Sequence, residues 1–564
     1  MAEKTLPETI RLRMRQLEEE KRWYEDRDYN IARYVNPRRE LIRDSQKYDN
    51  KGEERGKMSY TGVPNSALSI WADGMQGHMV SQSLNWFKNV LSDNNLNKID
   101  EVQRYLQEYD EAMYSEYNNS NFYAVLPEWF RDAGSVGTAT LFTEEDIGNE
   151  VSVHIVIHPR EIFIAEDRYG NVDTVFRKFF LTAKQAVEKF GDKKLSKDIV
   201  DNAKEHPEKR HEFIHAVYSN TDRMFNSILA IHKKYASVYI QAEADKVSDE
   251  PVRRSGFDIN PYAVWRLRKN SDEIYGYSPA ADAMVDIKNL NQMSRTLMKA
   301  AHMAVAPPLN VPEHMRGHTR MEPDGHNYYE KGGDKMSPVQ TGVNFPIGID
   351  REEKIQRIIE VKYRVEFFMI LARAEREMTA TEIMERQNEK GVLLGPQVDR
   401  MEREGLGRAN ENIHEIADKA GRLPEPPQIL IDAIEEAKLA RKKTVRLNMQ
   451  FIGPLAQAQR RMLMMQPIKN GLNEMAQAEV VIPGIVKGVN PDKLRDRIVE
   501  STNFPIDILY TSDELREIKE REAEELAQAQ AMQQAQGMAD AYPKISKKPE
   551  EGSPAELIGA QMGV

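Results

Sequence analysis

Two long helical patterns on either side of a proline- and glycine-rich segment constrain the fold of this sequence more than any other feature. The first pattern covers residues 278–306 and begins at Ser278-Pro279, where the serine can cap a helix and the proline suits its first position. Seam positions then advance by four and three residues alternately, which predicts one helix of about 40 Å with a narrow seam. The seam consists of Ala283, Ile287, Leu290, Ser294, Leu297 and Ala301.

The second pattern covers residues 350–377 and predicts a helix of matching length. Asp350 can cap its first turn while Glu353 reaches back to the cap. Because each seam buries only part of its helix, we expect the two helices to pack against copies of themselves in a ring. An intrachain helical hairpin is the alternative interpretation. The apolar face of the second helix consists of Ile355, Ile358, Ile359, Val365, Phe368, Met369 and Ala372.

The segment between the two helices, residues 307–349, contains six prolines and six glycines with several apolar residues among them. Structureless loops of this length are uncommon in compact domains, so we expect a small functional module at the tip of the helix pair. After the second helix, Thr379 and Glu382 form a capping box. This box predicts a turn at 378–381 and a new helix behind it.

The rest of the chain combines strands with helices. Residues 138–268 alternate apolar and polar side chains over short runs, which predicts an α+β unit. Helical periodicity dominates elsewhere, so the predicted fold class is α+β and predominantly helical. Helices are expected at 6–35, 66–80, 99–117, 429–442, 454–478 and 514–541, a further strand at 445–452, and a flexible tail at 542–564.

Composition excludes several function classes. The chain contains no cysteine, which rules out a disulfide framework, a thiol nucleophile and a thiolate metal site. Its 79 Lys and Arg residues against 90 Asp and Glu residues give a formal charge of -11, so any contact with DNA should be loose. No run approaches the roughly 18 apolar residues of a membrane helix, and charges near the start argue against a signal peptide. We therefore expect a soluble protein that is made and kept in a cytoplasm.

One segment matches a zinc-peptidase motif. His211, Glu212 and His215 reproduce the H-E-x-x-H pattern, in which two histidines one helical turn apart bind zinc. The neighbouring residues favour a strand instead, where positions four apart lie roughly 13 Å from each other. We interpret both histidines as surface residues of a strand and keep a zinc-dependent peptidase as an alternative. The chain contains no phosphate-binding loop and no nucleophile elbow, so no catalytic, cofactor-binding or metal-binding residues are predicted.

Two aromatic pairs could stack on bases in a protein that binds single strands: Trp86 with Phe87, and Trp129 with Phe130. In a chain with net negative charge, packing into the α+β core is the favoured interpretation of both pairs.

Several short segments, in order along the chain from about residue 10 to 510, together form a specific pattern. They are 60–64 (YTGVP), 67–68 (AL), 72–75 (ADGM), 85–87 (NWF), 273–280 (EIYGYSPA), 286–291 (DIKNLN), 306–308 (APP), 378–383 (MTATEI) and 453–460 (GPLAQAQR). With these segments the chain resembles the portal, or head-to-tail connecting, proteins of short-tailed bacteriophages. Tyr277 departs from the resemblance, since a basic residue is expected before Ser278-Pro279.

The resemblance implies a structural protein that forms a dodecameric ring around an axial DNA channel at one capsid vertex of the virion. The ring is assembled in the host cytoplasm, and its expected partners are the terminase large subunit, tail adaptor proteins, the major capsid protein, the scaffold and double-stranded DNA read without sequence specificity. The regions implied are a wing (1–277), two stem helices (278–306 and 350–377), a clip (307–349), a tunnel-loop region with a wing helix (378–428), a helical wing and crown (429–541) and the flexible tail (542–564). A multimeric scaffold or adaptor that does not conduct DNA remains an alternative.

The resemblance also implies three groups of candidate residues. An acidic channel wall would let DNA slide, and a few cations would centre the duplex. For each of these cations, a salt bridge between subunits is an alternative of at least equal weight. The channel candidates are Lys299, Lys354, Arg357, Arg373 and Arg376. The tunnel-loop candidates are Met378, Thr379, Ala380 and Thr381, and the clip candidates for docking are Met315, Arg316, Arg320, Tyr328, Tyr329 and Lys331.

Overall fold

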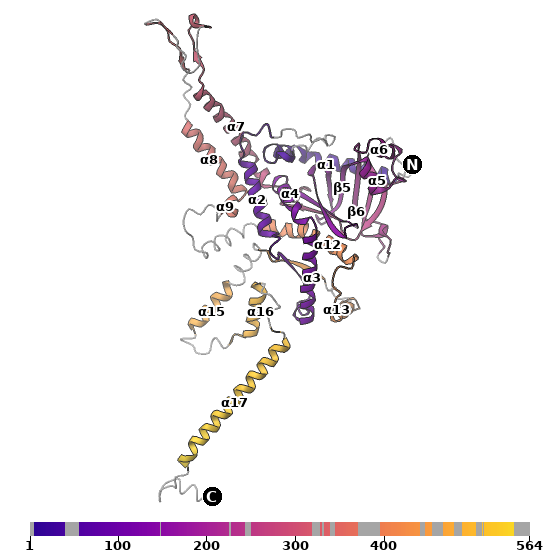
Figure 1. The fold of residues 1–564 in the computed structure, drawn as a ribbon, viewed down its shortest axis with the longest axis vertical. Helices are drawn as coiled ribbons and strands as arrows, with labels where there is room; N and C mark the ends of the chain where they lie inside the picture. Colours follow the sequence, from indigo (N-terminus) through magenta and orange to yellow (C-terminus); the bar gives the residue numbers. More distant parts are fainter. Residues whose placement is uncertain are drawn as a thin grey trace.

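The computed structural model shows a mixed α/β body with a two-helix hairpin extending from one side and one long helix, α17, extending from the other (Figure 1). The predicted α+β class is confirmed. No helix in the described part of the chain is long and apolar enough to cross a membrane. The structure describes residues 5–39, 56–146, 148–224, 227–242, 250–317, 328–329, 332–338, 345–369, 395–439, 446–453, 466–478, 488–502, 510 and 512–545.

Four helices open the chain. Three of them were expected from the apolar periodicity, and the first begins with a capping box formed by Thr5 and Glu8. The fourth was not predicted, because Pro127 lies inside it and proline normally interrupts a helix. These helices are α1 (Leu6–Tyr34), α2 (Val63–Met79), α3 (Asp100–Asn119) and α4 (Phe122–Ser135).

Two antiparallel sheets form the β part of the body. The three-stranded sheet has the order β3-β2-β9, and the five-stranded sheet has the order β4-β5-β6-β7-β8. Most of these strands lie where alternation predicted them, but β8 was missed. The strands are β2 (Thr138–Asp146), β3 (Val151–Ile157), β4 (Ile162–Glu166), β5 (Val172–Thr182), β6 (Arg210–Ser219), β7 (Tyr235–Gln241), β8 (Arg253–Phe257) and β9 (Tyr262–Arg266), with helices α5 (Ala183–Phe190) and α6 (Lys197–Glu205) between β5 and β6.

A third, two-stranded ribbon joins distant parts of the sequence. The predicted strand β12 (Leu447–Phe451) pairs antiparallel with β1 (Phe87–Leu91), which was not predicted. At the start of β1, Trp86 and Phe87 are buried, as are Trp129 and Phe130 in the same core. The prediction that both aromatic pairs pack into the core is therefore confirmed.

The first long helix, α7 (Pro279–Val305), lies where the sequence predicts it. Its Ser278 hydroxyl accepts a hydrogen bond from the Ala281 backbone N–H at 3.1 Å, which is the expected cap. The segment beyond it contains a short ribbon between β10 (Leu309–Asn310) and β11 (Ser337–Pro338).

The second long helix differs from the prediction. Helix α8 (Phe345–Lys362) begins five residues earlier than expected and has 18 residues against 27 in α7, so the two helices are not matched in length. Asp350 does not cap it, since it lies inside the helix and forms an ion pair with Lys354. The helix stops because Arg364 adopts a left-handed conformation with φ of 54°, and the short helix α9 (Val365–Phe368) follows. Residues 370–377 lie outside the described residues.

The C-terminal part is mostly helical, as predicted. Its long polar helix α17 continues to Ile545, so residues 542–545 are helical and not part of a flexible tail, while 546–564 lie outside the described residues. The elements are α11 (Gly395–Arg400), the π-helix η7 (Met401–Leu406), α12 (Gly407–Lys419), α13 (Gln428–Leu439), α15 (Gln466–Ala478), α16 (Pro491–Thr502) and α17 (Ser512–Ile545).

Candidate functional site

The projecting hairpin is formed by α7 and α8 of the same chain (Figure 1). Its helices approach closely where Gly348 faces the Leu297 side chain, since a Cβ at that glycine would overlap Leu297. Near the body, the Lys362 ammonium contacts the Asp286 carboxylate at 2.6 Å and donates a hydrogen bond to the Asp282 carbonyl at 2.8 Å. The intrachain hairpin, which the sequence left as an alternative, is therefore present.

The base of α7 is fixed by a close crossing of two backbone segments. Gly137, with φ of 90°, packs directly on Gly276, and neither position has room for a Cβ. The Gly276 N–H donates a hydrogen bond to the Thr138 hydroxyl at 2.7 Å, and the Ser278 hydroxyl donates one to the Ser135 carbonyl at 2.5 Å. The first turn of α7 is thus held against the end of α4 and the start of β2.

A second attachment lies further along α7. The Asn291 side chain accepts a hydrogen bond from the Tyr60 N–H at 2.6 Å and donates one to the Met58 carbonyl at 2.9 Å. The Arg295 guanidinium lies 5.4 Å from the centre of the Tyr60 ring. Two of the segments that carry the resemblance, 60–64 and 286–291, are therefore in direct contact.

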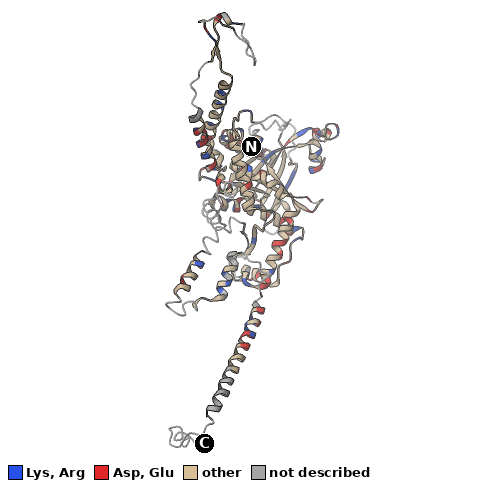
Figure 2. Ribbon diagram, turned by 60° about the vertical axis from the view of Figure 1, so that its left-hand side comes forward, with Lys and Arg blue, Asp and Glu red and all other residues tan. Residues whose placement is uncertain are grey.

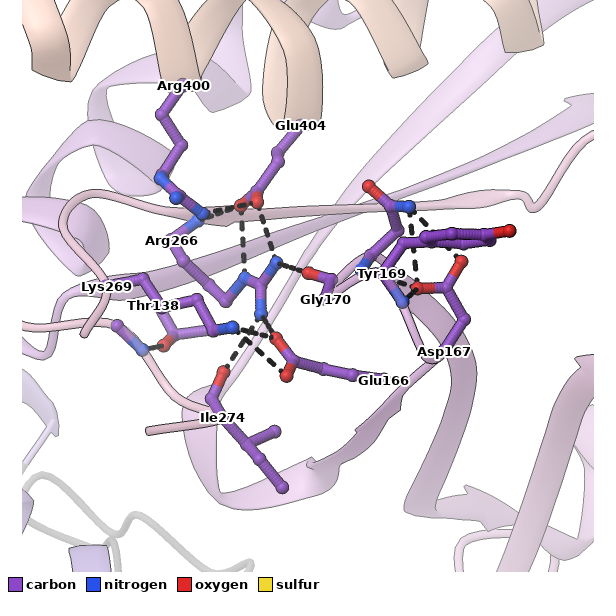
Figure 3. Close-up of polar contacts among 12 residues, drawn as sticks. Thr138, Glu166, Asp167, Tyr169, Gly170, Arg266, Lys269, Ile274, Arg400 and Glu404 are labelled. Carbon is purple, nitrogen blue, oxygen red and sulfur yellow. Dashed lines mark hydrogen bonds and ion pairs between the residues drawn. The ribbon is translucent and has the colours of Figure 1, made fainter. Parts of the chain in front are cut away.

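Arg266 is the centre of a buried polar network beside this base (Figure 3). Its guanidinium donates two hydrogen bonds to the Glu404 carboxylate, at 2.7 and 3.1 Å, and forms an ion pair with Glu166. Carbonyls of Gly170 and Ile274 accept further hydrogen bonds at 2.9 and 3.2 Å. Burial acts to lower the pKa of Arg266, but the two carboxylates outweigh burial and raise it, so the side chain stays charged.

The network joins four parts of the chain that are distant in sequence. Glu166 ends β4, Arg266 ends β9, Ile274 precedes α7, and Glu404 lies in the π-helix η7. Each carboxylate has a second cation, because Arg400 contacts Glu404 at 2.6 Å and Lys269 contacts Glu166 at 2.7 Å. The arrangement connects the five-stranded sheet, the segment that leads into α7, and the helices after residue 395.

The predicted channel residues occupy different settings. Lys299 is exposed on α7, while Lys354 and Arg357 on α8 are exposed but lie beside acidic residues of their own helix. Lys354 contacts Asp350 at 2.7 Å, and Arg357 lies 3.9 Å from Glu353. The remaining channel candidates and all four tunnel-loop candidates, Arg373, Arg376, Met378, Thr379, Ala380 and Thr381, lie outside the described residues.

The clip candidates are partly described. Met315 lies in a short 3-10 turn, Arg316 follows it on the surface, and Tyr328 is 89% exposed. The Tyr329 ring lies 4.8 Å from the Lys335 ammonium. Arg320 and Lys331 lie outside the described residues.

The zinc motif lies on strand β6, as the flanking residues predicted. The prediction that both histidines are surface residues is wrong for His215, whose ring is buried and stacked on Tyr239 at 3.8 Å. Both of its ring nitrogens are occupied, by the Tyr262 hydroxyl at 2.7 Å and the Ser237 hydroxyl at 2.9 Å, and burial holds the pKa of His215 well below its usual value. Within the described ranges, no group of three or more potential metal ligands is placed to bind an ion.

Sequence reasoning missed the residues that organise the base of the hairpin, namely Arg266, Glu404 and Asn291. One signal was available for Arg266, because it ends the otherwise apolar strand run YAVWR, where a buried cation requires a partner. Glu404 carries no comparable local signal, since it lies among many polar residues on a helix. Asn291 ends segment 286–291, which carries the resemblance, but nothing in that segment marks its side chain as an attachment point.

Comparison with known protein families places this chain in a class of bacteriophage structural proteins. The model of the family described as "Bacteriophage head to tail connecting protein" matches residues 7–509, and the chain belongs to this family. Similar proteins include the probable portal protein of Bordetella phage BPP-1, which is 26% identical over 547 residues that cover 95% of this chain and 94% of the relative. The portal protein of Salmonella phage epsilon15 is 25% identical over 558 residues, which cover 97% of this chain and 96% of that protein. The chain is therefore a structural connector and not an enzyme.

Proposed function

We propose that this protein is the portal of a bacteriophage capsid and forms a ring of twelve copies at one vertex of the virion head. Double-stranded DNA passes through the ring during packaging and again during ejection. Membership of the connecting-protein family and the names of both relatives support this function. In this proposal residues 278–306 and 350–377 are the stem, residues 307–349 the clip, 1–277 the wing, 378–428 the tunnel-loop region with a wing helix, and 429–541 the crown side with part of the wing.

The observation that carries the ring is a set of large apolar side chains that the hairpin leaves exposed. Val285 and Val305 on α7 are 71% and 88% exposed, and Val361 on α8 is 68% exposed. Ile347 and Ile358 on α8 are also exposed. Several exposed apolar side chains on a projecting element favour contact with another protein, and a closed ring of identical copies would cover them.

The clip supplies the docking surface in this proposal. It lies at the far end of the hairpin from the body, and its exposed Tyr328 offers an aromatic side chain of the kind that anchors protein interfaces. The terminase large subunit would dock there during packaging, and tail adaptor proteins would replace it later. The wing would contact the major capsid protein and the scaffold during assembly in the host cytoplasm.

Particle mass and negative-stain images of the purified protein test the ring. Twelve copies of 64.9 kDa give about 0.8 MDa, and an axial hole of roughly 20 Å or more would admit a DNA duplex. A closed ring without such a hole would favour the alternative of a scaffold that does not conduct DNA. A monomer that stays monomeric when mixed with its capsid and scaffold proteins would contradict the ring.

A further inference from the structure

A cavity of about 200 Å³ lies where the start of α1 meets the loop between α5 and α6 (Figure 1). Residues 193–196 of that loop, the end of β7 and residues 250–252 before β8 form its other walls. We call it the α1–α6 cavity. It lies within one chain, and neither the hairpin nor the network around Arg266 contributes to it.

The inner wall of the α1–α6 cavity is apolar. Leu195, Ile240 and Val252 line it, and all three are buried. Leu195 and Val252 belong to the apolar cluster under α5 and α6, while Ile240 belongs to the cluster under α1. Because these clusters are packed, the wall has a fixed position and the cavity is formed before any ligand enters.

The charged lining of the cavity is mainly positive. Among the described residues that line it, Arg11, Lys193 and Lys194 face one carboxylate, Glu250, which leaves a formal charge of +2. Cations and carboxylates are interspersed over the molecule as a whole (Figure 2), and the chain has a formal charge of -11. A mainly cationic cavity therefore departs from the general charge distribution of this chain.

Arg11 has an unused hydrogen-bond donor. Its Nη2 donates a hydrogen bond to the Gln241 carbonyl at 3.2 Å, but its Nε is buried and has no acceptor among the described residues. Burial lowers the pKa of Arg11, whereas two carboxylates raise the pKa of Arg266. Because a buried donor without an acceptor is costly, the Arg11 guanidinium is suited to an anion that supplies the acceptor.

The cavity has further donors beside Arg11. Lys193 and Lys194 are exposed and have no carboxylate partner within the part of the chain that the structure describes. Ser196 precedes α6, but its hydroxyl does not cap that helix. A phosphate group has three acceptor oxygens and a charge of about -1.5 to -2 at neutral pH, so it matches this donor set and charge better than a single carboxylate does.

We propose that the α1–α6 cavity binds a phosphate group, either as inorganic phosphate or as the terminal phosphate of a nucleotide. Its volume of about 200 Å³ is below the roughly 300 Å³ at which pockets for larger ligands begin, so the cavity holds the phosphate and leaves any sugar and base outside. The bound anion connects α1 with the α5–α6 loop and stabilises the folded chain. The site goes beyond the proposed function and does not depend on the ring.

The test compares two double variants with equal changes of charge. Lys193→Gln with Lys194→Gln removes two cations of the cavity. Lys184→Gln with Lys204→Gln removes two exposed lysines of α5 and α6 that do not line it. Calorimetric titrations of the full-length proteins use inorganic phosphate at constant ionic strength, because a change of salt would itself alter weak electrostatic contacts. Arg11 is left in place because it also bonds the Gln241 carbonyl.

The wild type should bind one phosphate per chain, and phosphate should raise its melting temperature. The cavity variant should bind phosphate about tenfold more weakly, while the control variant keeps the wild-type affinity. Absence of saturable binding by the wild type would overturn the proposal. Equal affinities in all three proteins would also overturn it, because phosphate would then bind elsewhere on the surface.

A parallel titration with adenosine diphosphate distinguishes the two sources of the phosphate group. Tighter binding of the nucleotide than of inorganic phosphate, lost in the cavity variant, identifies a nucleotide as the source. Equal or weaker binding of the nucleotide identifies free phosphate. Thermal melts without phosphate verify that both variants are folded as the wild type is.

Discussion

Replacing Arg266 by Met should lower the free energy of unfolding of the body by about 3 kcal/mol. Removing one partner of a buried ion pair costs about 3 to 5 kcal/mol, because the other charge stays buried without compensation. We expect the lower end of this range, because each carboxylate retains a second cation in the variant: Glu404 remains paired with Arg400, and Glu166 with Lys269. The Met side chain fills part of the volume but satisfies neither carboxylate nor the Gly170 and Ile274 carbonyls.

Two further variants make this prediction specific. Glu404→Gln keeps the side-chain volume and a hydrogen-bond acceptor, and Arg266 retains Glu166, so the expected loss is only about 1 to 2 kcal/mol. Arg403→Met is the matched control, because Arg403 lies in the same π-helix as Glu404. Its ion pair with Asp399, at 3.8 Å, is exposed to solvent. An exposed pair of this kind contributes less than about 1 kcal/mol.

Urea denaturation followed by tryptophan fluorescence is the suitable assay. Trp129 and Trp265 are buried with ring centres 4.8 Å apart, and both face Gly405, the residue after Glu404. Their emission therefore reports unfolding of the part of the body that contains the network. The reasoning would be wrong if Arg266→Met and Arg403→Met lowered the free energy of unfolding equally, within about 1 kcal/mol. In that case the desolvation cost of the buried charges would equal their mutual attraction.

Three other changes test separate parts of the structure. Gly276→Ala should lower the free energy of unfolding by about 2 to 3 kcal/mol, because the added Cβ overlaps the Gly137 carbonyl. Gly77→Ala is the control, since this helical position has open space around it and the variant should not lose stability. Thermal melts of both variants measure the difference. Burial raises the pKa of Asp110 to about 7, so the folded state binds an extra proton and stability falls as pH rises from about 4 to 7. Asp110→Asn should reduce that slope in urea titrations at several pH values, while the part due to Asp28 and Asp132, whose pKa values burial also raises, remains. An unchanged slope would exclude Asp110 as a source. Deleting residues 315–340 should spare ring assembly but abolish terminase docking in a pull-down, and undiminished binding would refute the clip assignment.

Local signals predicted the first long helix but not the second. Ser278 and Pro279 act within one turn, so the start of α7 follows from the sequence alone. At α8 two local signals compete, because Asp350 with Glu353 resembles a capping box while Pro346 suits a first turn. The helix begins at the earlier signal, and the two acidic residues instead form ion pairs with Lys354 and Arg357. The left-handed Arg364 that ends the helix has no sequence signal of its own.

The burial of His215 could have been predicted more completely from the sequence. In a strand, positions 213, 215 and 217 share one face, and Phe213 and Val217 mark that face as apolar. The histidine is tolerated there because Tyr262 and Ser237 satisfy both of its ring nitrogens. Neither partner is close in sequence, so the motif alone gave no indication of them.

The network around Arg266 shows where sequence reasoning reaches its limit. Glu166 and Glu404 lie 100 and 138 residues away along the chain, and only the packed fold brings them to the same guanidinium. The same holds for Asn291, whose partners Met58 and Tyr60 are more than 200 residues earlier. Pair contacts of this kind require the tertiary arrangement, whereas helix caps and strand alternation require only a few neighbouring residues.

The attachment at Asn291 has a mechanical consequence for the far end of the hairpin. Asn291 ties α7 to the backbone at 58–60, and the helix continues for 14 residues beyond it, to Val305. At 1.5 Å per residue this leaves a lever arm of about 21 Å. A tilt of about 5° at this attachment would displace the end of α7 by about 2 Å, comparable to the small helix shifts that occur at subunit interfaces. The two hydrogen bonds of Asn291 therefore control the position of the far end of α7, because any tilt that they allow is amplified along the lever arm.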